Sequence, residues 1–420
     1  MNRSGTGARD GAAGGGLTRR SFGRGAAAAG LVIAGPAGLR RARAAEPLKI
    51  GVLLPRSGFE AGLGQACQRG YDLAVPILAG MGQPIQLMNA DTESSQDTAR
   101  LQAEKLIREG AHVLSGAFDS GQTLAIAQVC EQKGVPFVVN IAADPSITEQ
   151  GYKFTFRNFP TSTILVTNGL GMMKAFFQAT GTTPKTAVLM HVNDAFGQSM
   201  LGGIDKLAPK VGLPFRIVET IAYDPKARDI SIEVAKAKAA HADLHMVVCR
   251  LNDAILMIRE MVKQRYQPMG IISPGSPGLY EGPFLKALGK YADYCMTCIA
   301  WMNPKQELNG ILEKAFVKAY PDQDYDLNIG FSFEAALIAA DAARLAGSTA
   351  PQALAEALRT THIEKRVMVG PAIHFDAKGQ NPDQAAAAVQ NLKRKPQVVL
   401  PETSAEAKPV FPMPGWQERT

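Results

Sequence analysis

The stretch Gly134–Asn158, GVPFVVNIAADPSITEQGYKFTFRN, decides the fold of this chain. It opens with a Gly-Val-Pro turn and continues into the apolar run Phe137–Val139, which indicates a buried parallel strand. Small residues follow as far as Ala143, and a second run of aromatic and β-branched residues begins at Phe154. Small side chains past the carboxyl end of a strand leave room for a ligand near the backbone. This stretch therefore predicts one wall of a binding cleft, followed by the first passage between two lobes.

The same alternation of strand and helix continues on both sides of this stretch. Strands are expected at Leu48–Leu54, Ile85–Asn89, His112–Gly116, Phe137–Asn140, Thr186–His191, Phe215–Thr220, Leu244–Cys249, Gly270–Ser273, Tyr294–Ala300, Ala372–Phe375 and Ala386–Gln390. Helices are expected at Gly64–Leu78, Asp97–Arg108, Gln122–Gln132, Ile164–Ala179, Phe196–Leu207, Ile230–Ala240, Ala254–Lys263, Pro283–Leu288, Leu308–Tyr320, Phe331–Leu345 and Pro351–Leu358. One α/β pattern used twice predicts two lobes, each with a mainly parallel sheet flanked by helices, and a cleft at the carboxyl ends of both sheets.

Residues 1–44 are interpreted as an export signal rather than as part of the fold. Thr18–Arg24, TRRSFGR, contains a twin arginine, and the mild apolar segment Ala26–Leu39 follows it. Ala42-Arg43-Ala44 then provides a small-x-small cleavage site. The apolar segment is too short and too weak for a membrane span, so the order of its parts predicts a twin-arginine leader and a periplasmic protein.

The positive charge of the chain lies in this leader. Residues 1–44 hold eight Arg, no Lys, one Asp and no Glu, a net charge of +7 that equals the +7 of the whole chain. The remaining residues are near neutral, so the basic pI gives no reason to expect a nucleic-acid partner. No later stretch is long and apolar enough to cross a bilayer, so we expect no membrane span once the leader is removed.

Five cysteines follow the leader: Cys67, Cys130, Cys249, Cys295 and Cys298. Export would permit a disulfide, and the C-x-x-C formed by the last two is a spacing seen in redox and zinc sites. Here it lies in an apolar run that reads as a strand, where residues three apart lie on opposite faces. No second C-x-x-C is present. We therefore expect buried structural thiols.

An exported redox enzyme is the main alternative from another class of protein. The chain contains no G-x-S-x-G, no H-E-x-x-H and no Walker A motif. Its six histidines are scattered, and the pair His241 and His245 straddles a helix end and a strand start. We therefore expect a protein that is not an enzyme and has no catalytic residues, no cofactor and no metal site.

Six ordered motifs resemble one protein family. They are Leu48–Gly64 (LKIGVLLPRSGFEAGLG), Asp91–Gly110, Gly116–Thr123 (GAFDSGQT), Asp144–Arg157 (DPSITEQGYKFTFR), Asn193–Gln198 (NDAFGQ) and Val369–Asp376 (VGPAIHFD). From Leu48 to about Leu400 the chain is similar to type I periplasmic substrate-binding proteins of ABC transporters, in the leucine/isoleucine/valine-binding family. The match is closest in Asp144–Arg157, within the opening stretch.

This resemblance implies a fold, a mode of action and partners. Three hinge crossings are expected at 156–161, 299–301 and 359–363, with lobe one at 46–158 plus 300–360 and lobe two at 159–299 plus 361–400. Residues 401–420 are expected to be a poorly ordered surface strap. Lobe closure would bury a small-molecule ligand and present it to the membrane subunits of an ABC permease. We expect a monomer, and the alternative use of the fold is a periplasmic sensor for a signalling partner.

The resemblance also implies ligand contacts at particular positions. In the first lobe they are Ser57 and Phe59 after the first strand, Asp119 and Ser120 in the GAFDSG turn, and Ala142 and Ala143 in the opening stretch. In the second lobe they are Phe196, Arg250 and Ser276.

Two departures from the family pattern bear on the ligand. The hydroxyl that would grip an amino-acid carboxylate is missing because the position reads Ala143, and the loop around Ser276 offers no carboxylate for an ammonium. An arginine stands at 250, where it would suit an anionic ligand or instead form a salt bridge between the lobes. We therefore expect a small polar metabolite, either an organic acid, which could be aromatic, or an amino-acid-like molecule; Asp119 or Asp144 could receive an ammonium.

Overall fold

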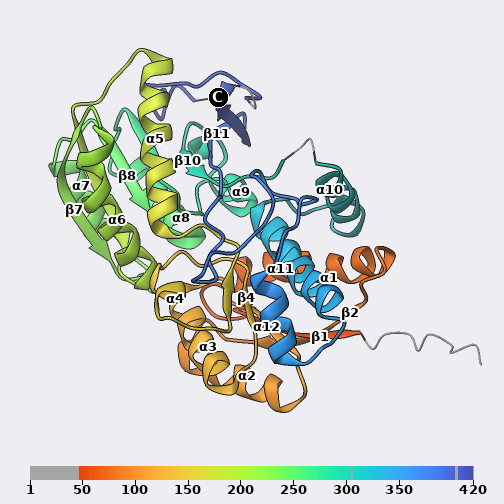
Figure 1. The fold of residues 1–420 in the computed structure, drawn as a ribbon. Helices are drawn as coiled ribbons and strands as arrows, with labels where there is room; N and C mark the ends of the chain where they lie inside the picture. The colour runs from red at the N-terminus through yellow and green to blue at the C-terminus, as the bar shows by residue number, and fades with distance from the viewer. Residues whose placement is uncertain (1–46, 304–305, 403–404, 420) are drawn as a thin grey trace, which may run out of the picture. The chain divides into compact units, whose positions relative to one another are not determined.

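The computed structural model describes residues 47–303, 306–402 and 405–419, so the expected leader lies outside the described residues. The first part of the described chain forms a parallel sheet with the strand order β2-β1-β3-β4-β5 (Figure 1). Its strands are β1 (Leu48–Leu54), β2 (Ile85–Asp91), β3 (Val113–Gly116), β4 (Phe137–Val139) and β5 (Thr155–Arg157). Parallel strands need crossover connections, and these are the helices that cover the sheet.

Helices cover both faces of this five-stranded sheet. One face carries α1 (Ala61–Gly80), α10 (Glu307–Ala319), α11 (Leu327–Ala346) and α12 (Pro351–Arg359). The other carries α2 (Gln96–Arg108) and α3 (Ser120–Lys133), while the short α4 (Ser146–Glu149) precedes β5. Strand β1 serves both faces, since Ile50 packs on the first side and Leu53 on the second, and both are fully buried. This two-sided burial explains the continuous apolar run of β1.

The second sheet has seven strands in the order β12-β11-β10-β9-β8-β6-β7. Its parallel part is β6 (Thr186–Val192), β7 (Arg216–Tyr223), β8 (Leu244–Val248), β9 (Gly270–Ser273) and β10 (Met296–Ile299). An antiparallel hairpin of β11 (Ala387–Leu392) and β12 (Lys395–Leu400) extends it. The flanking helices are α5 (Ser162–Thr180), α6 (Ala195–Val211), α7 (Ser231–Ala239), α8 (Leu251–Lys263), α9 (Gly282–Leu288) and the 3₁₀ turn η1 (Gly289–Ala292).

The chain returns to the second sheet later than expected. Gln380 still bridges Arg157 of β5, and the Gly379 carbonyl accepts from the Arg157 N–H at 2.8 Å. Gly379 has a φ of +77°, and a Cβ there would lie 2.2 Å from the Thr155 carbonyl oxygen. The chain joins the second sheet at β11, which begins at Ala387. The polar sequence around Gly379 gave no strand signal because this pairing is only one residue long.

The C-terminal segment is packed on the second half of the chain, and the expectation of a poorly ordered strap is wrong. Phe411, Met413 and Trp416 are each at most 8% exposed. The Trp416 Nε1 donates to the Tyr266 carbonyl at 2.8 Å, and the Phe411 ring lies 5.0 Å from that of Phe177. Three apolar side chains spread among prolines have no helix or strand period, which is why the pattern missed them.

Several other expectations can be compared with the structure directly. The strands Leu48–Leu54 and Gly270–Ser273 are confirmed to the residue, but Ala372–Phe375 is reduced to a single bridge between Ile363 and Ile373, and β12 was missed. All five cysteines are free and buried, and their burial is as expected. His245 is fully buried beside Tyr266, and burial lowers its pKa to about 3.

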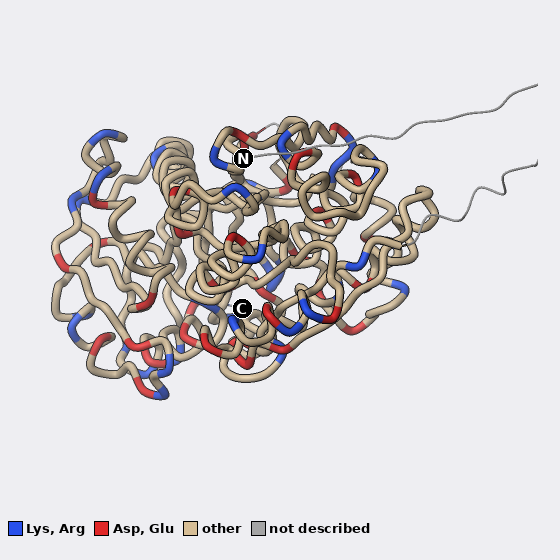
Figure 2. Tube along the Cα trace, turned by 60° about the horizontal axis from the view of Figure 1, so that its bottom comes forward, with Lys and Arg blue, Asp and Glu red and all other residues tan. Residues whose placement is uncertain are grey.

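Figure 2 shows basic and acidic residues interspersed along the described chain.

Candidate functional site

A cavity lies where the carboxyl ends of strands from both sheets meet. About 400 Å³ of space there, part of it open to solvent, is not occupied by atoms. The opening stretch provides Ile141, Ala142 and Ala143 directly after β4, and β10 provides Ile299. The remaining apolar walls come from both halves of the chain: Phe118, Phe159, Phe196, Gly275, Pro277, Tyr280 and Leu327.

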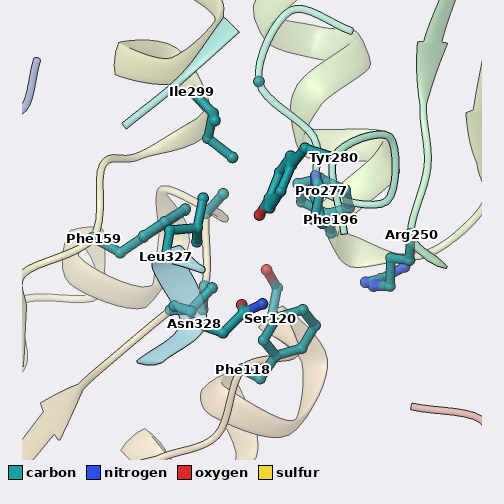
Figure 3. A pocket seen from close by; sticks show the side chains of 14 residues that line it. Phe118, Ser120, Phe159, Phe196, Arg250, Pro277, Tyr280, Ile299, Leu327 and Asn328 are labelled. Atoms are coloured by element: carbon teal, nitrogen blue, oxygen red, sulfur yellow. The ribbon is translucent and has the colours of Figure 1, made fainter. Parts of the chain in front are cut away.

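Three polar groups gather inside these apolar walls. The hydroxyl groups of Ser120 and Tyr280 point toward one another across the cavity, and the Asn328 amide lies beside Ser120 (Figure 3). The Tyr280 hydroxyl and the Asn328 Oδ1 are buried and have no hydrogen-bond partner among the described residues. Burial raises the pKa of Tyr280 well above its usual value, and the electrostatic effect of the Glu281 carboxyl group adds to this. The hydroxyl therefore keeps its proton. A buried polar atom without a partner is costly, and a bound molecule would supply one.

Two helices begin at this cavity. Ser120 is the first residue of α3, and Leu327 and Asn328 open α11. The N-terminal end of a helix carries partial positive charge and N–H groups without intrahelical partners, so it favours an anionic group. The α3 end is capped by Asp119, whose carboxylate accepts from the Gln122 N–H at 3.0 Å. That carboxylate also forms a salt bridge with Arg250.

Arg250 borders the cavity and is surrounded by carboxylates. Its Nη2 lies 3.0 Å from Asp119 Oδ2, its Nη1 lies 2.5 Å from Asp194 Oδ2, and its Nε lies 3.3 Å from Glu60 Oε1. The guanidinium carbon also lies 5.0 Å from the centre of the Phe196 ring. The side chain is only 7% exposed, and these carboxylates raise the pKa of Arg250 against the opposing effect of burial. The arginine is therefore charged and already neutralised within the protein.

Glu60, the third carboxyl group beside Arg250, has a raised pKa. Burial, and next the charge of Asp119, raises its pKa to about 8, although Arg250 and a hydrogen bond from Gln122 at 2.8 Å act in the opposite direction. At neutral pH the contact between Glu60 and Arg250 is thus mainly that of a protonated carboxyl group with a cation, despite the 3.3 Å separation. Arg250 also pairs with Asp119 and Asp194, whose side chains are 14% and 21% exposed.

A second hollow lies on the other side of Arg250. It is lined by Phe59, Glu60, Val192, Pro225 and Arg250, among others. The Phe59 carbonyl accepts from the Asn252 side chain at 2.6 Å, which joins the loop after β1 to the start of α8. Arg250 lines both spaces and stands between them.

The structure brings most of the sequence-predicted residues to this region. Ser120, Ala142, Ala143, Phe196 and Arg250 line the first cavity, Phe59 lines the second hollow, and Asp119 binds Arg250.

Besides Asp119, two of the predicted residues lie outside the walls of both spaces. Ser57 is exposed, and its N–H donates to Asp91 at 3.2 Å. The Ser276 hydroxyl accepts from the Cys249 N–H at 3.0 Å and also contacts Ser273. The neighbours of Ser276, Gly275 and Pro277, reach the cavity instead.

Sequence reasoning missed three polar groups of this region. Tyr280 lies only four residues beyond Ser276, but nothing in the loop pattern separates a wall residue from a core residue. Asn328 comes from α11, far along the chain, where Asp326 caps the helix and accepts from the Asn328 N–H at 2.9 Å. The Asp-x-Asn helix start was the available signal for this residue. Glu60 was missed although its neighbour Phe59 was named.

Solved structures of other proteins share this fold. The substrate-binding protein LivJ of a branched-chain amino acid transporter from Streptococcus pneumoniae, in complex with isoleucine, superposes with a TM-score of 0.72 at 17% identity, over 87% of this chain and 100% of that one. A solute-binding protein of an ABC transporter from R. palustris, in complex with benzoate, superposes with a TM-score of 0.74 at 23% identity, over 86% of this chain and 98% of that one. At this level of identity the likeness shows the two-lobed type I fold.

Sequence relatives and a family model agree with the structural likeness. The Leu/Ile/Val-binding protein homolog 8 of Brucella abortus is 28% identical over 251 residues, 58% of this chain and 61% of the length of that protein. Homolog 7 of the same species is 25% identical over 383 residues, which cover 87% of this chain and 94% of that protein. The model of the family described as periplasmic binding protein matches residues 47–396. The chain therefore belongs to the periplasmic binding protein family, and its named relatives are Leu/Ile/Val-binding protein homologues.

Proposed function

We propose that this protein is the solute-binding receptor of an ABC transporter, and that it captures a small molecule between its two lobes outside the cytoplasm. Family membership supports a solute-binding role rather than a catalytic one. Within the described ranges, none of the helices combines the length and apolar character needed to cross a bilayer. The lobes of this proposal are the halves built on the two sheets, joined after β5, after β10 and before β11. Closure would select the arrangement that a permease recognises.

The proposed ligand is a small organic acid with an apolar, preferably aromatic, body. The observation that carries this proposal is the unpaired Tyr280 hydroxyl facing Ser120 inside a cavity walled by aromatic and aliphatic side chains. The unpaired Asn328 Oδ1 is an acceptor, so it would pair with a hydroxyl group of the ligand rather than with its carboxylate. The two hydroxyl groups are donors for a carboxylate, and the starts of α3 and α11 favour negative charge. The phenylalanine rings offer edges and faces to a flat molecule.

Other features count against a free amino acid as the ligand. Ala143 presents a methyl group where a hydroxyl would bind an α-carboxylate, and Asp119 and Asp194, two carboxylates near the cavity, are engaged by Arg250. An α-ammonium would therefore have to compete with a buried guanidinium for its partner. The fold itself does not decide the question, because the two solved neighbours hold isoleucine and benzoate.

A thermal-shift screen followed by calorimetry tests the proposal. The panel contains benzoate, hydroxybenzoates, phenylacetate, succinate, leucine and isoleucine. We expect the aromatic acids to raise the unfolding temperature, since a ligand at 100 times its dissociation constant adds about 2.7 kcal/mol of stability. Tight binding of leucine or isoleucine without any response to the acids would refute the organic-acid assignment, and silence across a broad metabolite panel would refute the receptor role.

Substitution of Tyr280 locates the site. Tyr280→Phe keeps the ring and removes the hydroxyl, and we expect affinity for the acid to fall by roughly tenfold to a hundredfold, the range for a hydrogen bond to a charged group. Tyr325→Phe is the matched control, because its hydroxyl donates to Asn309 at 2.8 Å and does not line the cavity. Equal affinities for the wild type and Tyr280→Phe would place the ligand elsewhere.

A further inference from the structure

We infer that Arg250 is a positioning residue that holds the two halves of the chain in the closed arrangement, rather than the counter-ion of the bound molecule. The inference deepens the proposed function and rests on it for its biological meaning, but its geometry and its test do not require a ligand. It concerns the junction of β8 and α8, where Arg250 occupies the N-cap position.

The guanidinium joins carboxylates that belong to different sheets. Asp119 follows β3 of the five-stranded sheet and caps α3, whereas Asp194 follows β6 of the seven-stranded sheet and caps α6. Arg250 itself follows β8 of the seven-stranded sheet and reaches both, at 3.0 Å and 2.5 Å. The contact with Asp119 therefore crosses between the halves, and Asp194 holds the arginine from its own side.

Further contacts keep this side chain in one orientation. Glu60, from the loop after β1, lies 3.3 Å from Nε, so that all three guanidinium nitrogens face carboxyl groups. The Phe196 ring covers the guanidinium at 5.0 Å. Asn252, two residues along the chain, adds its hydrogen bond to the Phe59 carbonyl, a second link between the same two halves. An arginine fixed by so many partners has little capacity left for a ligand.

The charges around Arg250 explain why its removal would open the molecule. The acidic groups that face it are Asp119 and Glu60 from one half and Asp194 and Asp253 from the other; Asp253 accepts from the Arg250 N–H at 3.0 Å. Without the arginine, the carboxylates of Asp119 and Asp194, from opposite halves, would face each other, and their side chains are only 14% and 21% exposed. Like charges there repel strongly, and separation of the halves relieves the repulsion.

Distance measurements without ligand test this inference. Spin labels at Leu101→Cys on α2 and Ile232→Cys on α7 report the separation of the halves, since these side chains are 64% and 67% exposed while all five native cysteines are buried. We expect a closed population in the otherwise wild-type protein. Arg250→Met should raise the ratio of open to closed molecules by about tenfold or more, which corresponds to ~1.4 kcal/mol.

Matched variants separate this role from a general loss of charge or fold. Arg344→Met removes an arginine that pairs with Asp341 at 2.6 Å on the surface of α11, and it should leave the distances unchanged. Asp119→Asn and Asp194→Asn retain helix-capping side chains, so they test the same contacts should Arg250→Met fail to fold. An unchanged distance distribution in these folded variants, or a wild type without closed molecules, would overturn the inference. If Tyr280→Phe lost aromatic-acid binding while its distance distribution matched the wild type, the result would support the proposed ligand site and leave the inference about Arg250 unchanged.

Discussion

Glu334 and Arg366 form an ion pair with both side chains fully buried, and the Arg366 Nη2 lies 3.0 Å from the Glu334 Oε2. The same carboxylate accepts from the backbone N–H groups of Val367 and Met368, at 2.8 and 2.9 Å, and from the Asn158 side chain at 2.6 Å. Asn158 follows β5, at the first passage between the sheets. Through the single side chain of Glu334, helix α11 therefore binds both Asn158, which follows β5, and the segment after α12.

Glu334→Ala should destabilise the protein by about 3–5 kcal/mol, the usual cost of leaving one partner of a buried ion pair alone. Arg366 and two backbone N–H groups would lose their acceptor at once. Urea unfolding followed by circular dichroism measures the change, and Glu356→Ala on the exposed side of α12 serves as the control. A loss below about 1 kcal/mol, typical of a surface pair, would show that the pair does not hold this region together.

The raised pKa of Glu60 predicts an unusual dependence of stability on pH. Between its ordinary pKa of 4.5 and its folded value of about 8, the folded protein holds a proton that the unfolded chain has released. The free energy of unfolding should therefore fall as the pH rises through this window, by on the order of a few kcal/mol from this group. Burial raises the pKa of Asp326 to about 6, which contributes in the same direction over a narrower range.

Unfolding free energies at pH 5.5 and pH 8.5 check this prediction. Glu60→Gln cannot titrate, so its difference between the two pH values should be clearly smaller than that of the wild type. Glu356→Gln changes the same type of side chain at an exposed position and should retain the wild-type difference. If Glu60→Gln and the wild type lost the same free energy on raising the pH, Glu60 would be ionised throughout.

The C-terminal segment should contribute to stability. Trp416 is 6% exposed, its ring lies 4.0 Å from the Arg419 guanidinium carbon, and its Nε1 binds the Tyr266 carbonyl. Trp416→Ala should lower the free energy of unfolding by roughly 3 kcal/mol, at the low end for a buried aromatic residue. Val317→Ala, at a side chain that is 57% exposed, is the control and should be nearly neutral in the same denaturant titration. A neutral Trp416→Ala would mean that the segment detaches in solution.

Local patterns in the sequence predicted much of the fold because several buried strands are rich in apolar residues. The strands β1 and β9 and the opening stretch, with its small residues at Ala142 and Ala143, are examples. The patterns failed where structure depends on single contacts between distant segments. The bridge between Arg157 and Gln380, the buried Trp416 and the α11 residue Asn328 are of this kind.

The charge environment of Arg250 was equally inaccessible to sequence reasoning. The sequence marks the residue as a departure from the family pattern, and it leaves open whether the arginine binds an anionic ligand or forms a salt bridge between the lobes. Its partners Glu60, Asp119 and Asp194 are separated from it by as many as 190 residues, and no periodicity links them. Sequence position alone therefore could not show that all three guanidinium nitrogens of Arg250 contact carboxyl groups of the protein.

Ala143→Ser tests the link between this position and the choice of ligand. The Ala143 methyl group lines the cavity close to Ser120, so a serine there would add a second hydroxyl beside the start of α3. We expect affinity for leucine to rise by about tenfold, as for one added hydrogen bond to a carboxylate, and affinity for aromatic acids to fall because the new hydroxyl crowds the apolar wall. Calorimetry with both ligands measures the two changes, and Ala79→Ser at the exposed end of α1 is the control. If acid binding were unchanged and leucine still failed to bind, the missing hydroxyl at Ala143 would not determine the ligand, and the acidic groups held by Arg250 would be the next determinant to test.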